Sequence, residues 1–385
     1  MKREILDLGY EIERVEDGKV TFLADAEGIA YANLFLRTTE RILLKVGQVH
    51  AETYDELFEA TKALPWEKFI PKNGKFWVTK ANSIKSKLFS PSDIQSIMKK
   101  AIVERLKQVY HMEWFPEDGA QYPIRVSILK DEVTIGLDTS GVSLHKRGYR
   151  KLTAKAPITE TLAAALIMLT PWKGDRILVD PFCGSGTFPI EAAMMAADIA
   201  PGLNRSFLAE QWTHLVPKKC WMDAAEDARY RIRNDIETDI QGFDIDGDVI
   251  KSARENAKLA GVEKRCHFEV ADVADFAAKQ EAIVLTNPPY GERMSTIEGA
   301  AKLARTLGRQ MEAHPCAGVY AITADMDFET HYGKRANKRR KMYNGMIPCQ
   351  LYMYYSAPKF EHTAKPMPKS GFDGKRTAPN RFNKK

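Results

Sequence analysis

Short apolar runs alternate with segments of helical periodicity between about residues 171 and 357. The runs are DRILVD, GFDID, CHFEVAD, AIVLTN, GVYAIT and CQLYMYYS, and each has the length of a buried strand. Alternation of this kind is typical of α/β proteins and predicts a doubly wound, parallel sheet with helices on both faces. Ligands of such sheets bind at the carboxyl ends of the strands, so the residues that follow each run are the candidate site residues.

The first 150 residues follow a different pattern. KVTFLAD, RILLKVG, KFWVTKA and IRVSILK read as strands, and SDIQSIMKKAIVERLKQVY reads as one long basic helix. This mixture predicts an α+β region ahead of the doubly wound sheet. The stretch LHKRGYRKLTAKAP (144–157) reads as the join between the two parts.

Length and composition agree with two globular domains. A chain of 385 residues exceeds one ordinary core, and 44% hydrophobic with 28% charged residues is a soluble composition. The longest apolar stretch, 161–170, is too short to cross a membrane, and the charged start lacks the features of a signal peptide. We therefore expect a cytoplasmic protein. The five cysteines form no C-x-x-C pair, which disfavours disulfides and a metal site.

The net charge of +6 is concentrated in a few segments. Residues 359–385 hold eight Lys or Arg and two acidic residues, in a Pro- and Gly-rich tail that we expect to be disordered. The join carries Lys146, Arg147 and Arg150 around Tyr149, and GKRANKRRK (333–341), read as a loop near the active face, carries Lys338, Arg339 and Arg340. Basic runs of this kind suit RNA phosphates, and an embedded aromatic suits a base. A solvated surface is an equally reasonable interpretation of all three segments.

The strand ILVD runs into the glycine-rich turn PFCGSGT and then into a helix-like segment. A P-loop would need Lys and Ser or Thr after the second glycine, and Thr187 follows Gly186 directly. A dinucleotide fingerprint would need a third glycine where Pro189 stands, and an acidic residue about 20 positions further on, whereas Asp244 lies 58 residues after Gly186. The turn alone is therefore a weak signal for any ligand.

The residues at four strand ends, in DPFCGSGT, DID, ADVADF and NPPY, are more specific when taken together. They describe a pocket for S-adenosylmethionine. Asp180 can accept a hydrogen bond from the ligand's ammonium group, and Gly184 and Gly186 leave room for its amino-acid moiety. Asp244 can accept from the ribose hydroxyls. In the same arrangement Ile245 would lie against the purine, and Asp272 would accept from its exocyclic amine.

The motifs DPFCGSGT, GFDID, ADVADF and NPPY resemble, in this order, those of class I methyltransferases that act on exocyclic or amide nitrogens. The continuous stretch from LDTSGVSLHKRGYRK to ADIAPGLNRSF resembles more closely the THUMP-domain 23S rRNA guanine-N2 methyltransferases, the type found as the N-terminal half of a fused bacterial enzyme. The likeness covers nearly all of residues 1–357.

This resemblance implies an organisation and a set of site residues. It implies a ferredoxin-like part (1–44) whose first strand is missing, a THUMP RNA-binding domain (45–155), and a class I methyltransferase domain (156–357) in which the last strand is antiparallel; the basic tail (358–385) lies outside it. The cofactor-binding set that it implies is Asp180, Cys183, Gly184, Gly186, Thr187, Asp244, Ile245, Asp272, Val273 and Asn287.

The segment NPPY supplies the expected catalytic residues. A base amine is a poor nucleophile because its lone pair is delocalised, and two acceptors that bind its N–H groups can localise that pair and aim it at a methyl group. The side-chain oxygen of Asn287 and the carbonyl of Pro288 can serve as these acceptors, on a backbone stiffened by Pro289. Tyr290 would stack on a base turned out of its pairing.

Several acceptors remain open at this point. A guanine N2 in 23S rRNA is the leading interpretation, and a tRNA guanine is the second. NPPY would also suit adenine N6 in DNA or a glutamine amide in a protein, but the basic N-terminal region favours RNA, so neither DNA nor a membrane is an expected partner. Pyrimidine-carbon chemistry would need a nucleophilic cysteine, and Cys183 lies in the cofactor turn. An inactive RNA-binding or ribosome-assembly factor is the alternative from another class.

Overall fold

The structure is a computed structural model that describes residues 1–150, 158–290 and 297–355. The predicted basic tail and the second half of the predicted join therefore lie outside the described residues. Within the described ranges the chain forms a two-stranded, a four-stranded and a seven-stranded sheet. No helix in these ranges is long and apolar enough to cross a lipid bilayer.

The seven-stranded sheet has the order β12-β13-β11-β10-β7-β8-β9. Its strands are β7 (Leu178–Asp180), β8 (Ile240–Asp244), β9 (His267–Val270), β10 (Ile283–Thr286), β11 (Gly318–Thr323), β12 (Lys338–Asn344) and β13 (Ile347–Tyr355). The first five pair in parallel, and β13 is antiparallel to both β11 and β12. The predicted fold, a mostly parallel sheet whose last strand is antiparallel, is confirmed.

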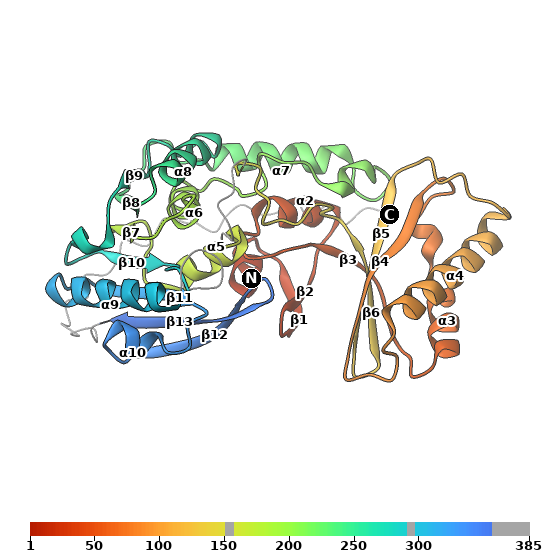
Figure 1. Ribbon diagram of the computed structural model, residues 1–385. Helices are drawn as coiled ribbons and strands as arrows, with labels where there is room; N and C mark the ends of the chain where they lie inside the picture. Colours follow the sequence, from red (N-terminus) through yellow and green to blue (C-terminus); the bar gives the residue numbers. More distant parts are fainter. Residues whose placement is uncertain (151–157, 291–296, 356–385) are drawn as a thin grey trace.

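Helices cover both faces of this sheet (Figure 1). One face packs against α5 (Glu160–Leu169), α6 (Thr187–Ala196) and α8 (Gly247–Leu259), and the other packs against α9 (Ile297–Ala313) and α10 (Phe328–Tyr332). The side chains of a strand alternate between the faces: in β10, Ile283 and Leu285 join the first apolar cluster and Val284 joins the second. Burial on both faces explains why these strands read as continuous apolar runs.

The N-terminal part has two smaller sheets. Helix α1 (Lys2–Asp7), the hairpin β1 (Glu11–Glu16) and β2 (Lys19–Leu23), and α2 (Ala26–Phe35) come first. A sheet of order β3-β6-β5-β4 follows, formed by β3 (Leu43–His50), β4 (Lys75–Ile84), β5 (Gln121–Leu129) and β6 (Glu132–Asp138), with helices α3 (Tyr54–Ala63) and α4 (Pro91–Tyr110). Short 3₁₀ turns span Trp66–Lys68, Leu208–Gln211 and Val273–Asp275.

The long basic helix expected after residue 92 is α4, and local chemistry sets its ends. The Ser90 hydroxyl accepts from the Asp93 N–H, and Pro91 occupies the first turn, where no N–H is needed. Ile94, Met98 and Ile102 recur at helical spacing and are buried. The helix ends at His111, which adopts a left-handed conformation with φ of 54°.

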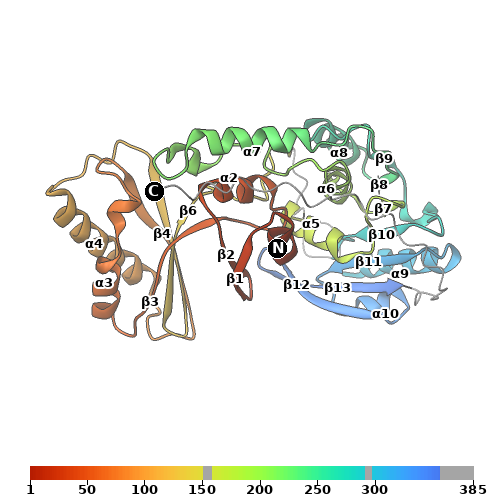
Figure 2. The same cartoon turned by 180° about the vertical axis from the view of Figure 1, so that it is seen from behind.

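Helix α7 (Lys218–Tyr230) belongs in sequence to the half of the chain that forms the seven-stranded sheet, but it packs against α2 in the N-terminal part (Figure 2). The segment before α7 makes the same connection. The Trp212 ring stacks on Tyr122 of β5 with centroids 5.1 Å apart, and its indole N–H donates to the carbonyl of Gln121 at 2.9 Å. One apolar cluster therefore joins residues from both halves of the sequence.

The basic segment at 333–341 agrees with its prediction as a loop only in its first part, residues 333–337, which connect α10 to β12. Lys338 begins the edge strand β12, whose backbone bonds to β13 along its whole length. Charged side chains at a sheet edge discourage pairing with another chain, which accounts for a strand that carries so little apolar character.

Candidate active site

The predicted strand-end residues meet at the carboxyl edge of the seven-stranded sheet. In the parallel register, Asp180 at the end of β7 pairs with Gly242 in β8, and Asp244 at the end of β8 pairs with Val270 in β9. Strand β10, which leads into Asn287, lies on the other side of β7. The glycine-rich turn and the NPPY segment therefore follow neighbouring strands.

The two glycines of the turn have different structural roles. Gly184 has φ of 52°, and a Cβ added there would meet no atom within 4 Å, so the turn leaves open space at this position. Gly186 is the N-cap of α6 with φ of 84°, and a Cβ there would lie 2.9 Å from the Phe268 ring. Gly186 thus allows close packing, whereas Gly184 provides the room that a ligand needs.

The carboxylate of Asp244 supports the turn from the neighbouring strand. Its Oδ2 accepts from the Gly184 N–H at 3.0 Å, and its Oδ1 accepts from the Asp246 N–H at 3.1 Å. Each oxygen retains a further lone pair for a ligand hydroxyl. Ile245 follows with 69% of its side chain exposed. An exposed apolar residue directly after a ligand-facing carboxylate suits a flat ring.

Asp272 and Val273 lie at the end of the next strand. The Asp272 carboxylate accepts from the Ala274 N–H at 2.9 Å and begins a short 3₁₀ turn, and Val273 is buried behind it. Asn256 of α8, which the sequence did not single out, donates to the carbonyl of Ser185 at 3.2 Å and so fixes the glycine-rich turn to α8. A buried amide on an otherwise apolar helix face was the available signal.

Asp180 is buried and ties the two motifs together. Its Oδ1 accepts from the Thr286 hydroxyl at 2.6 Å and from the Phe182 N–H at 3.1 Å. Burial raises the pKa of Asp180 to about 7, even though both hydrogen bonds act in the opposite direction. The bond to a ligand ammonium stays a prediction. Thr286, directly before Asn287, was missed, although a Thr that ends an apolar strand could have signalled a partner.

Cys183 is buried, and burial raises the pKa of its thiol well above the ordinary value. Its Sγ lies 3.6 Å from the carbonyl of Gly184. A thiol of this kind is a packed side chain with little thiolate character.

The NPPY segment begins directly after Thr286. Pro288 is buried, and Asn287, Pro289 and Tyr290 are half-buried. Because Thr286 is bonded to Asp180, the start of the segment is held against the end of β7. The following residues, 291–296, lie outside the described ranges.

The join requires a correction to the predicted RNA contacts. Arg147 and Tyr149 are 3% and 2% exposed, and both contact the buried carboxylate of Glu191 on α6. Arg150 is also engaged, with its guanidinium at 2.7 Å from the Thr187 hydroxyl. Basic side chains enclosed by protein cannot meet RNA phosphates, and the sequence could not reveal the enclosing helix. Lys146 alone of this group is exposed.

Lys338, Arg339 and Arg340 are exposed on β12, and Arg339 lies 3.6 Å from Glu329 of α10. Arg339 shares a register row with Tyr352, Ala321 and Thr286, so the β12–β13 hairpin extends beyond the carboxyl end of β10. Tyr343 and Met346 near its turn are 69% and 96% exposed. The turn of the hairpin therefore lies beyond the same carboxyl edge of the sheet as NPPY.

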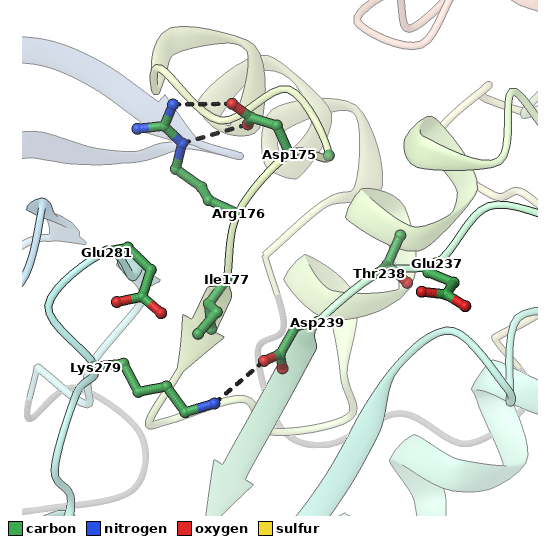
Figure 3. A pocket seen from close by; sticks show the side chains of 9 residues that line it. Asp175, Arg176, Ile177, Glu237, Thr238, Asp239, Lys279 and Glu281 are labelled. Atoms are coloured by element: carbon green, nitrogen blue, oxygen red, sulfur yellow. Dashed lines mark hydrogen bonds and ion pairs between the residues drawn. The ribbon is translucent and has the colours of Figure 1, made fainter.

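A solvent-open hollow lies at the opposite, amino edge of the sheet (Figure 3). Asp175 pairs with Arg176 at 2.9 Å, and Asp239 lies 3.5 Å from Lys279. These charges satisfy one another and face away from the predicted chemistry, so the hollow is not the cofactor site. Among the described residues no group of His, Cys, Asp and Glu could hold a metal ion.

Three family models match successive parts of the chain. Residues 147–353 match the family described as RMKL-like, methyltransferase domain. Residues 51–138 match the THUMP domain, and residues 1–43 match the RlmL ferredoxin-like domain.

Two kinds of relative stand out among curated proteins. The putative RNA methyltransferase YpsC of Bacillus subtilis is 45% identical over 357 residues, which cover 92% of each chain. The ribosomal RNA large subunit methyltransferase K/L of Syntrophotalea carbinolica is 34% identical over 83% of this chain. The match covers only 46% of that K/L protein, so the chain spans about half its length.

Solved structures share the whole architecture. A possible methylase from Clostridium difficile is 48% identical with a TM-score of 0.88, covering 92% of this chain and 94% of that chain. SMU.472, a putative methyltransferase complexed with SAH, is 40% identical with a TM-score of 0.85 over the same shares. With matches of this extent, the chain belongs to the RMKL-like methyltransferase family and carries a THUMP domain ahead of its catalytic domain.

Proposed function

We propose that this protein transfers a methyl group from S-adenosylmethionine to the exocyclic N2 of a guanine in 23S rRNA. The coarser assignment, an S-adenosylmethionine-dependent RNA methyltransferase of the K/L type, follows from the family and from the relatives that share it. The observation that carries the transfer chemistry is the placement of NPPY directly after Thr286, whose hydroxyl donates to Asp180 at the start of the candidate cofactor turn. The choice of guanine rests on the resemblance of the sequence to the guanine-N2 enzymes.

The residues at the carboxyl edge fit this cofactor. The open space at Gly184 accepts the amino-acid moiety, the free lone pairs of Asp244 accept ribose hydroxyls, and exposed Ile245 lies against the adenine. Asp272 and Val273 would complete the adenine side. A relative 40% identical to this chain was solved with SAH, the demethylated form of the same molecule. When bound, the cofactor supplies an electrophilic methyl group on a sulfonium.

The protein's own task in this reaction is orientation. The side-chain oxygen of Asn287 and the carbonyl of Pro288 accept the two hydrogens of the base amine, so that its lone pair points at the methyl group. The adjacent prolines restrict the backbone that carries both acceptors. Tyr290 would stack on the turned-out base. No covalent enzyme intermediate is needed, which agrees with the buried, protonated Cys183.

Two observations favour RNA over other kinds of acceptor. The THUMP domain precedes the catalytic domain, and the K/L relatives are named as large-subunit rRNA enzymes. A relative of known structure that is 46% identical, from Listeria monocytogenes, is described as a predicted N6-adenine-specific DNA methylase, and NPPY suits that amine equally well. A tRNA guanine is the second RNA acceptor that the fold allows.

The test is transfer of labelled methyl from S-adenosylmethionine to 23S rRNA, tRNA and DNA taken from a strain without this gene. Nucleoside analysis should find N2-methylguanine in the 23S rRNA digest alone. Product in tRNA, or N6-methyladenine in any of the three, would replace the proposed acceptor. No transfer to any of the three, together with no S-adenosylmethionine binding in calorimetry, would favour the alternative of an inactive assembly factor.

A further inference from the structure

The basic join offers a second role that its sequence did not suggest. We infer that Arg150, with Arg147 and Tyr149, is a positioning group for the cofactor turn: it clamps the first two turns of α6 rather than binding RNA. The inference deepens the proposed function, since it concerns the S-adenosylmethionine site of the same domain.

The clamp begins at the first residue of α6. Thr187 directly follows Gly186, and its buried hydroxyl accepts from the Arg150 guanidinium at 2.7 Å. The same guanidinium lies 3.0 Å from the Glu160 carboxylate on α5, with only 10% of the Arg150 side chain exposed. A planar group with several donors can bridge two elements in this way, whereas an ammonium presents a single point of charge. Arg150 therefore fixes the start of α6 relative to α5.

The second contact lies one turn further along the same helix. Glu191 is four residues after Thr187 and completely buried, so both side chains face the join. Its Oε1 accepts from the Tyr149 hydroxyl at 3.2 Å and lies 3.5 Å from the Arg147 guanidinium. Arg147 also donates to the carbonyls of Leu144, at 2.7 Å, and Arg37. The clamp is thus anchored in the N-terminal part of the chain.

Buried charges of this kind need a compensating role. Burying an arginine and a carboxylate costs desolvation free energy that a solvated linker would not lose. Hydrophobic residues of similar volume could fill the same space without that cost. An ion pair that fixes geometry gives such residues a function. Here the fixed helix is capped by Gly186, two residues after Gly184, so a shift of α6 would move the backbone of the candidate cofactor turn.

The test is SAH affinity of the full-length protein, measured by calorimetry without RNA. Arg150→Ala and Thr187→Val should each weaken SAH binding about tenfold, as expected for a lost charge-assisted hydrogen bond. The double variant should bind SAH no more weakly than Arg150→Ala, because Arg150→Ala already removes the bond to Thr187. Arg176→Ala is the matched control: this half-exposed arginine pairs with Asp175 at the amino edge (Figure 3), and its loss should leave SAH affinity unchanged.

Affinity for deproteinised 23S rRNA, measured by filter binding, separates the clamp from an RNA contact. Arg150→Ala should bind this RNA as the unmodified protein does. Unchanged SAH affinity, independent effects in the double variant, or weaker RNA binding with normal SAH binding would each overturn the inference. If Arg150→Ala does not fold, Arg150→Met, which keeps the aliphatic volume, replaces it in the single and double variants. The guanine assignment can fail without affecting any of these measurements.

Discussion

Asn287 occupies the first position after the buried strand β10, where Thr286 is bonded to Asp180. Asn287 also belongs to the implied cofactor-binding set, but an acceptor held in this way acts mainly on the substrate amine, so its loss should affect methyl transfer far more than cofactor affinity. We expect Asn287→Ala to lower the rate of methyl transfer about 10²- to 10³-fold, the loss typical of one preorganised hydrogen-bond group. SAH affinity from calorimetry should stay within about twofold. An equal loss of both quantities would contradict the role given to this residue.

Asp180 predicts a pH dependence of stability at the same scale. Its pKa is raised by burial from about 4 when unfolded to about 7 in the fold, so the folded state holds the proton between these values. The stability that protonated Asp180 contributes is complete below pH 4 and is lost as pH rises to 7. Asp180→Asn should remove this loss, worth up to about 4 kcal/mol. Urea unfolding of the unmodified protein and of Asp180→Asn from pH 5 to 8 should show the variant gaining relative stability until about pH 7. If the two unfolding free energies change in parallel with pH, the raised pKa of Asp180 is refuted.

At the scale of elements, the glycine turn predicts two separable effects. Alanine at Gly186 would meet the Phe268 ring at 2.9 Å in a left-handed backbone, so Gly186→Ala should lower both the unfolding free energy, by more than about 1 kcal/mol, and SAH affinity. Alanine at Gly184 meets no protein atom within 4 Å, so its cost in stability is only that of the backbone. The free energy of SAH binding that Gly184→Ala loses should therefore be much larger than the unfolding free energy that it loses. Normal SAH affinity in this variant would place the cofactor elsewhere.

The β12–β13 hairpin predicts a contribution to RNA binding. Lys338 and Arg340 lie on one face of the edge strand, at spacing 2, and both are exposed. If each neutralises a phosphate, Lys338→Ala with Arg340→Ala should weaken 23S rRNA binding and reduce the slope of log K against log salt by about 1.4 to 1.8. The pair Arg176→Ala and Lys279→Ala, at the amino edge, removes the same charge and should leave the slope unchanged. Equal effects of the two pairs would indicate a general charge effect.

For the whole molecule, Trp212 predicts that the two halves unfold together. It is completely buried between the catalytic half and Tyr122 of the four-stranded sheet. Trp212→Ala should lower the unfolding free energy by about 3 to 5 kcal/mol and keep a single transition in both far-UV circular dichroism and fluorescence. Trp114→Ala, which removes an indole that is 73% exposed, should change it by less than about 0.5 kcal/mol. Two separate transitions in the unmodified protein would show that the halves unfold independently.

Periodicity and strand-end chemistry were enough to predict the sheet, its helices and most of the candidate site. Runs such as AIVLTN read as buried strands because both of their faces are covered, and the residues that follow parallel strands necessarily gather at one edge. The prediction of a loop was wrong for KRRK (338–341), because these charged residues carry no strand-like pattern. An edge strand needs no alternating apolar pattern, since one backbone edge and much of its side-chain surface stay in water.

The sequence alone was therefore enough to predict the fold class and the order of the motifs, and to propose their chemistry, because these depend on local pattern and on residue type. Tertiary structure alone decided which side chains are accessible. A run of Arg and Tyr reads identically whether it faces RNA or a buried glutamate, and only the packing of α6 against the join assigned Arg147 and Tyr149 to the interior. The same holds for Thr286 and Asp180, which are 106 residues apart and meet only because β10 pairs with β7.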